Sequence, residues 1–153
     1  MTPLPSAVDT ERALLGGLIQ DPDQIDDVAV RGADFYRDDH ARLFALLCDM
    51  RRAGEVIDLV TVPERVTRGG GHNEYGGVAY VVQLADHCPS PQAVPEYARI
   101  VRDKAVLRAL IRDADAIRRA ALEDPGDVGG LVGRAAHAIS QLADVAGSDG
   151  WTS

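Results

Sequence analysis

Few residues of this 153-residue chain have the types and spacing that catalysis or the binding of a nucleotide or metal requires. A phosphate-binding loop of the form G-x-x-x-x-G-K-[ST] needs a lysine beside a glycine-rich turn, because that lysine must reach the phosphates. The only lysine, Lys104, follows Asp103 within a long predicted helix. The sequence therefore predicts no nucleotide site of this type and no cofactor bound by this chain.

The histidines do not form a recognisable metal site. They are His40, His72, His87 and His137. None belongs to an H-x-x-x-H or C-x-x-C pair, and His87-Cys88 is the only adjacent pair of soft ligands. No G-x-S-x-G element marks a nucleophile. We predict no catalytic residue and no metal ligand, and we interpret His40 as orienting the start of its helix through a hydrogen bond.

Composition indicates a globular protein that does not bind nucleic acid through a positively charged face. The chain is 46% hydrophobic and 26% charged, with a net charge of −8 and a sequence pI near 4.8. Neutralising phosphates requires a basic face, which this balance disfavours. No apolar run approaches the roughly 20 residues of a membrane span, and no secretory signal is evident. We therefore expect a cytoplasmic protein with no membrane partner.

The first part of the chain, residues 1–90, predicts a compact multi-helix globule. Its predicted helices cover about 9–20, a short stretch after Pro22, 38–53, 59–68 and 77–87. Asp58 is placed to cap the fourth of these. Gly16-Gly17 lies inside the first helix, and we expect it to allow a neighbouring backbone to approach closely.

Residues 91–146 predict an antiparallel helical hairpin that projects from the globule. One amphipathic helix spans about 95–123, and Asp127 is placed to cap a second helix. Each helix can bury only one stripe against the other, and the remaining apolar positions need a further partner. We predict self-association through the hairpin; the alternative is that the hairpin folds back onto the globule. Residues 147–153 are predicted to be a flexible tail.

Five short motifs occur in order over about 90 residues. They are Glu11-Arg-Ala-Leu-Leu-Gly16, Asp34-Phe-Tyr-Arg37 with His40, Asp58-Leu-Val-Thr61, Gly76-Gly-Val-Ala-Tyr80 and Glu96-Tyr-Ala-Arg-Ile-Val-Arg102. Together they resemble the N-terminal domain of the bacterial replicative DNA helicase, the DnaB family. The resemblance covers about residues 5 to 146.

The resemblance implies an all-α assembly and docking domain without a catalytic site. In that family the hairpins pair into dimers, and three dimers form a collar above six ATPase domains, which bind ATP and magnesium and carry the 5′–3′ helicase activity. The collar docks the helicase-binding domain of primase, and a helicase loader is a further candidate partner. Single-stranded DNA is met only indirectly, through the assembled ring. A linker and the ATPase domain would follow the tail.

Carried over to this chain, the resemblance implies two sets of interface residues. The primase-facing set is Asp9, Glu11, Tyr80, Ile111 and Ile117. The self-association set is Leu107, Leu110, Ile111, Leu131, Ile139 and Leu142. Ile111 fits both sets, and Tyr80 fits equally well as a core aromatic whose hydroxyl reaches the surface.

Two other functions are compatible with the sequence. A free-standing adaptor or inhibitor would bind helicase or primase through the same surface. A small metal-dependent hydrolase would use His72, His87 and nearby carboxylates.

Overall fold

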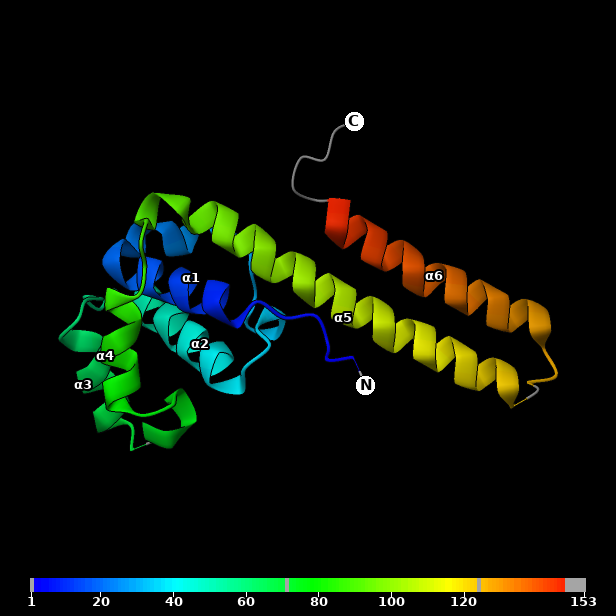
Figure 1. The fold of residues 1–153 in the computed structure, drawn as a ribbon, viewed down its shortest axis with the longest axis horizontal. Helices are drawn as coiled ribbons and strands as arrows, with labels where there is room; N and C mark the ends of the chain where they lie inside the picture. Colours follow the sequence, from blue (N-terminus) through cyan, green and yellow to red (C-terminus); the bar gives the residue numbers. More distant parts are fainter. Residues whose placement is uncertain (1, 71, 124, 148–153) are drawn as a thin grey trace. The chain divides into compact units, whose positions relative to one another are not determined.

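The regular elements of the chain are all helical in the residues that the structure describes. The computed structural model describes residues 2–70, 72–123 and 125–147. The α-helices are α1 (Val8–Gln20), α2 (Asp38–Arg52), α3 (Thr61–Arg68), α4 (Val78–Asp86), α5 (Val94–Leu122) and α6 (Val128–Gly147). Short 3-10 turns are η1 (Pro22–Asp26), η2 (Gly32–Asp34), η3 (His72–Tyr75) and η4 (Pro91–Ala93). The predicted all-α class is confirmed (Figure 1). None of the described helices has the length and apolarity to span a membrane.

The chain divides into two compact units. The globule is Ser6–Arg102, and the hairpin unit joins Met1–Pro5 to Asp103–Ser153. We predicted the boundary between residues 90 and 91, but it falls inside α5. The reason is packing: Val94, Ala98 and Val101 of α5 are buried in the core of the globule. The predicted tail lies almost wholly in residues 148–153, outside the described residues.

The core of the globule is aliphatic and is built around α1. Leu14, Leu15 and Leu18 of α1 are fully buried, and residues of the other four helices surround them. The other fully or nearly fully buried members include Leu43, Leu47 and Met50 of α2, Val62 and Val66 of α3, and Val81 and Leu84 of α4. Burial of this apolar surface holds together the helices that carry the polar residues described below.

Gly16 and Gly17 allow α1 to pack closely against α4 and the segment after it, as predicted. A Cβ on Gly16 would lie 2.1 Å from the carbonyl oxygen of Leu84. A Cβ on Gly17 would lie 2.5 Å from a methyl carbon of Val94. A larger residue at Gly16 would meet the backbone of α4, and one at Gly17 would meet the side chains of Cys88 and Val94.

Two predicted caps are present. Asp58 Oδ1 accepts hydrogen bonds from the backbone N–H groups of Val60 and Thr61, each at 2.8 Å. These bonds, that from Thr61 first, lower the pKa of the Asp58 carboxyl. The helix begins at Thr61, two residues after the predicted start, because the cap uses Val60 as part of the turn. Asp127 Oδ1 likewise accepts from the N–H of Gly130 at 3.0 Å, at the start of α6.

The hairpin unit contains the second half of α5 and all of α6. Figure 1 shows α6 running back along that half of α5 in the opposite direction. Arg108 of α5 is buried, and its Nη1 donates to the carbonyl oxygen of Pro5 at 2.9 Å, which ties the N-terminal segment to the helix. In contrast, no residue of α6 is buried.

We expect Gly16→Ala to destabilise the protein although alanine favours helix by about 1 kcal/mol. The added Cβ meets the Leu84 carbonyl oxygen, so overpacking should outweigh the propensity gain and cost about 1–3 kcal/mol net. Urea unfolding of both proteins measures the difference. Gly133→Ala in α6 is the matched control, since no atom lies within 4 Å of its Cβ position, and it should leave stability unchanged or higher. A Gly16→Ala variant as stable as the parent would contradict close packing.

Candidate functional site

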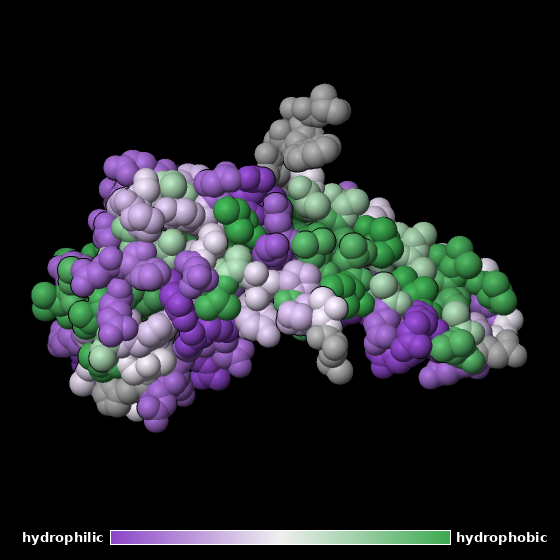
Figure 2. All heavy atoms as spheres, in the orientation of Figure 1, coloured by the Kyte–Doolittle hydropathy of each residue, from purple (hydrophilic) through white to green (hydrophobic). Residues whose placement is uncertain are grey.

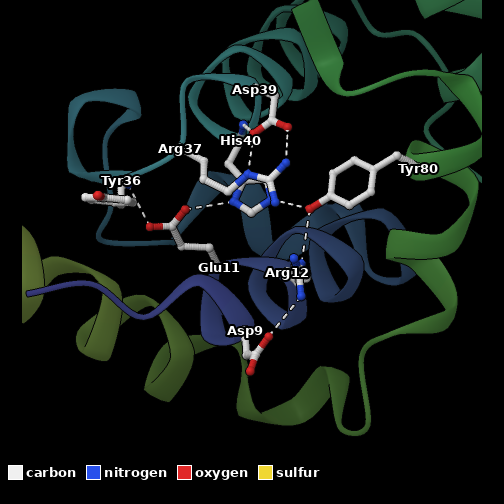
Figure 3. Close-up of polar contacts among 8 residues, drawn as sticks. All are labelled: Asp9, Glu11, Arg12, Tyr36, Arg37, Asp39, His40 and Tyr80. Carbon is white, nitrogen blue, oxygen red and sulfur yellow. Dashed lines mark hydrogen bonds and ion pairs between the residues drawn. The ribbon is translucent and has the colours of Figure 1, made fainter. Parts of the chain in front are cut away.

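A network of polar side chains joins α1, the start of α2 and α4 on one side of the globule. We call it the polar network (Figure 3). Its members are Asp9, Glu11, Arg12, Arg37, Asp39, His40 and Tyr80. His40 lies at its centre, and Figure 3 shows its ring held between Glu11 and the Tyr80 hydroxyl.

His40 uses both ring nitrogens within the protein. Its Nδ1 lies 2.7 Å from Glu11 Oε1, and its Nε2 lies 2.5 Å from the Tyr80 hydroxyl. The His40 and Tyr80 rings are nearly parallel, at 6° with centroids 5.9 Å apart. The His40 side chain is 0% exposed, so no molecule outside the protein reaches it in this conformation.

Glu11 is a buried carboxylate whose two oxygens are both occupied. Oε1 faces His40, and Oε2 accepts the backbone N–H of Tyr36 at 2.7 Å. Its side chain is 1% exposed. An unpaired buried carboxylate is very costly, so these partners are required for the fold to accept Glu11 at all.

Tyr80 carries the network to the surface. Its hydroxyl accepts from Arg12 Nε at 3.2 Å, and Arg12 Nη1 donates to Asp9 Oδ1 at 3.0 Å. With the proton of His40 assigned to Nδ1, each hydrogen has one acceptor: Arg12 donates to Tyr80, Tyr80 to Nε2, and Nδ1–H to Glu11. Such a chain of bonds strengthens its members by mutual polarisation.

Arg37 and Asp39 close the outer side of the network. Arg37 forms two hydrogen bonds with Asp39, at 3.0 and 2.5 Å, and its guanidinium lies 5.1 Å from the centre of the Tyr80 ring. Burial raises the pKa of the Asp39 carboxyl, but the Arg37 hydrogen bond, the nearby charges and the His40 backbone N–H together outweigh it. The pKa of Asp39 is therefore lowered.

Gly76 gives the Gly76-Gly-Val-Ala-Tyr80 motif its place beside the network. Its φ is +82°, in the left-handed region that favours glycine. A Cβ there would lie 2.7 Å from the Tyr80 ring and 2.9 Å from Asp39 Oδ2. The loop before α4 can therefore approach both residues only with glycine at this position.

The network has the residue types of a proton relay, but its geometry is closed. His40 cannot meet a substrate, and the Tyr80 hydroxyl is already bonded to Arg12 and His40. Among the described residues, no group of three or more His, Cys, Asp or Glu side chains is placed to hold a metal ion. The His72 side chain, which the hydrolase hypothesis uses, lies outside the described part. What the arrangement can do is hold a surface rigid.

The structure brings together three of the five predicted primase-facing residues. Asp9, Glu11 and Tyr80 all belong to the polar network. Only Asp9, with an 88% exposed side chain, and the half-buried Tyr80 offer surface; the burial of Glu11 assigns it an internal role. Ile111 is exposed and Ile117 half-buried in the hairpin unit.

Sequence reasoning missed the central residue of the site. We predicted that His40 orients the start of its helix through a hydrogen bond, and the structure shows a wider role for its side chain. The His40 side chain joins residues that are 29 and 40 positions away in sequence. Arg12 and Arg37 were also missed; their places within two quoted motifs were the only available signal.

The predicted self-association residues lie on the hairpin unit and retain accessible surface. Leu107, Leu110, Ile111 and Ile139 are exposed, whereas Leu131 and Leu142 are half-buried.

We expect Asp39→Asn to remove a pH-dependent part of the stability. The folded pKa of Asp39 lies below its ordinary value of 3.8, so its ionised form stabilises the fold above that pH. This contribution is lost as the pH falls through the folded pKa. Thermal unfolding should therefore show the parent more stable than Asp39→Asn near pH 6, with the difference shrinking by pH 3. A constant difference would show that the charge of Asp39 is not involved.

Comparison with known proteins identifies the family. Residues 3–103 match the family described as DnaB-like helicase N terminal domain. The chain is 33% identical over 141 residues to the replicative DNA helicase DnaB of Geobacillus stearothermophilus, covering 91% of this chain and 31% of that protein. It is 30% identical over 142 residues to the replicative DNA helicase DnaC of Bacillus subtilis, again covering 91% of this chain and 31% of that protein. The chain thus spans about a third of the length of the curated relatives it matches.

Solved structures show the same fold. The crystal structure of the N-terminal domain of DnaB helicase from Mycobacterium tuberculosis matches with a TM-score of 0.81 and 31% identity, covering 90% of this chain and 99% of that one. A DnaB-like replicative helicase, whose structure was described with its interactions with primase, matches with a TM-score of 0.72 and 20% identity over 89% of this chain and 31% of that one, and shares the fold. These matches confirm the resemblance seen in the motifs: the chain belongs to the family of DnaB-like helicase N-terminal domains.

Proposed function

We propose that this chain is the collar domain of a replicative hexameric DNA helicase, which assembles through its hairpin and docks primase during DNA replication. The catalytic site, with ATP and magnesium, would belong to the ATPase domain of the full-length helicase. The chain itself contributes an assembly surface and a docking surface. The net charge of −8 agrees with protein partners better than with direct capture of DNA.

The observation that carries the proposal is the exposed apolar surface of the hairpin unit. No residue of α6 is buried, although the helix is rich in leucine, isoleucine, valine and alanine. Large apolar side chains of the unit are 39% to 73% exposed, namely Leu107, Leu110, Ile111, Leu122, Val128, Val132 and Ile139. Figure 2 shows the hydrophobic residues gathered over α6 and the adjoining part of α5.

Apolar surface of this kind favours association with a similar surface. Full burial of an aliphatic side chain contributes about 1.5–3 kcal/mol, so these partly exposed side chains each contribute a fraction of that, and a two-fold interface uses every one of them twice. Because α5 and α6 present apolar residues along much of their length, a second hairpin is the partner that matches the surface best. Pairing of hairpins would give the dimers from which a six-membered collar is built.

Primase docking is supported by the surface above the polar network. This surface presents two charges and an aromatic ring within one small area, from Asp9, Arg12 and Tyr80. Tyrosine and arginine are enriched at the centres of protein interfaces. The fold neighbour described with primase supports the choice of partner.

We expect Ile139→Asp to weaken self-association by about a hundredfold or more, because pairing would bury an unpaired carboxylate. Sedimentation equilibrium over a range of concentrations measures the effect. Gln141→Asp is the matched control, since it places the same residue at an exposed position of α6 about half a turn away. A parent chain that stays monomeric at high concentration would overturn the proposed assembly.

We expect saturable binding of the C-terminal helicase-binding domain of primase, and we expect Asp9→Arg to weaken it by about tenfold. Titration calorimetry with that domain measures both. Asp27→Arg makes the same change at another exposed position of the globule and should leave binding unchanged. Absence of binding by the parent, in both its monomeric and associated forms, would remove docking from the proposal.

A further inference from the structure

We propose that His40 and Glu11 are positioning residues of the docking surface: they fix the Tyr80 hydroxyl and, through it, Arg12. This inference rests on the proposed docking function and names the internal residues that prepare the surface for it. Neither residue would touch the partner.

Burial excludes direct contact by the two inner residues. The His40 side chain is 0% exposed and that of Glu11 is 1% exposed. Each can therefore influence a bound protein only through other side chains. The link from His40 to Tyr80 is its Nε2, which lies 2.5 Å from the Tyr80 hydroxyl.

The chain of hydrogen bonds has a fixed inner end and an accessible outer end. At the inner end, Glu11 Oε2 accepts the backbone N–H of Tyr36, which anchors the carboxylate to the segment before α2. At the outer end, Tyr80 accepts from Arg12 Nε, and the Arg12 side chain is 32% exposed. The backbone of one helix start thus determines where a surface guanidinium lies.

Arg12 is held on one edge and available on the other. Its Nε is committed to Tyr80, whereas its Nη1 pairs with Asp9, whose side chain is 88% exposed. An ion pair that exposed is weak and exchanges readily for another partner. A guanidinium oriented in this way can accept a polar group of a docking protein without first losing the freedom of a long side chain.

Tyr80 is fixed on its ring as well as at its hydroxyl. Its ring lies parallel to that of His40, Arg37 lies over it at 5.1 Å, and the absent Cβ of Gly76 leaves room for its edge. Loss of the His40 side chain removes the hydroxyl bond and the parallel ring together, whereas the Arg37 and Gly76 contacts remain. The Tyr80 hydroxyl can then shift, so Arg12 loses an acceptor at a defined position.

The first test needs no partner. His40→Asn retains an amide near the Nδ1 position that can still donate to Glu11, but it is too short to reach Tyr80. Hydrogen exchange of the Arg12 Nε–H, followed by NMR in the full chain, should be slow in the parent relative to that of Arg134, an exposed arginine of α6. We expect exchange of the Arg12 proton to become about tenfold faster in both His40→Asn and Tyr80→Phe.

A control separates positioning from loss of stability. Val66→Ala removes buried core volume in α3, away from the network, and should leave the Arg12 exchange rate unchanged at a temperature where the protein is folded. If Arg12 exchange is unaffected by His40→Asn, or is accelerated equally by Val66→Ala, the inference is overturned. Tyr80→Phe removes the acceptor of Arg12 and gives the exchange rate expected once that bond is lost, and Glu11→Gln disturbs His40 from its Nδ1 side if His40→Asn fails to fold.

The second test uses docking to primase. We expect His40→Asn and Tyr80→Phe each to weaken binding of the primase domain by about two- to tenfold, and the double variant to be no weaker than Tyr80→Phe alone. That result follows if His40 acts on Arg12 through the Tyr80 hydroxyl, since Tyr80→Phe already removes that link. Full additivity of the two losses would overturn positioning. Failure of the parent to bind would overturn the docking proposal, while Arg12 exchange still decides whether His40 positions Arg12.

Discussion

The buried pairing of Glu11 with His40 is the interaction on which the arrangement of the globule's polar surface depends. It joins α1 to α2 by a 2.7 Å contact between two buried side chains. Apolar packing alone specifies helix positions loosely, because neighbouring arrangements bury similar area. A carboxylate with two required partners has one acceptable arrangement, and it thereby selects one registry of the helices around it.

The two units differ in which side chains they bury. In the globule, polar residues are taken inside and every one of the central groups is paired, as Glu11 and His40 illustrate. In the hairpin unit, apolar residues such as Leu110 and Ile139 remain outside. The first unit is thus complete within one chain. The second leaves apolar side chains exposed, as surfaces that bind a partner do.

Local signals predicted the helices and several of their ends. Apolar steps of three and four residues identified the long helix, and Asp58 and Asp127 were recognised as caps because a cap involves residues two or three positions apart. Gly16 was recognised as a close approach from its position within a helix. The boundary between the units was misplaced because Ala98 and Val101 continue the same helical pattern on both sides of it.

The polar network could not be predicted in the same way. Glu11, His40 and Tyr80 are separated by 29 and 40 residues, and no periodicity relates residues on different helices. Each of the three residues nevertheless belongs to one of the five motifs. A motif names residues that are close in sequence, but it does not say which residues they contact in the fold. The structure supplied the contacts, and it moved Glu11 from the surface, where the resemblance implied it, to the interior.

The absence of any buried residue in α6 links folding of the hairpin to the amount of protein present. Helices that bury little of their own chain are marginal in water, and their order depends on tertiary partners. A second molecule that covers the apolar face binds only the folded form and stabilises it by mass action. If the hairpins pair as proposed, dilution should melt this helix before it affects the globule, because folding and assembly of the hairpin would then be one equilibrium.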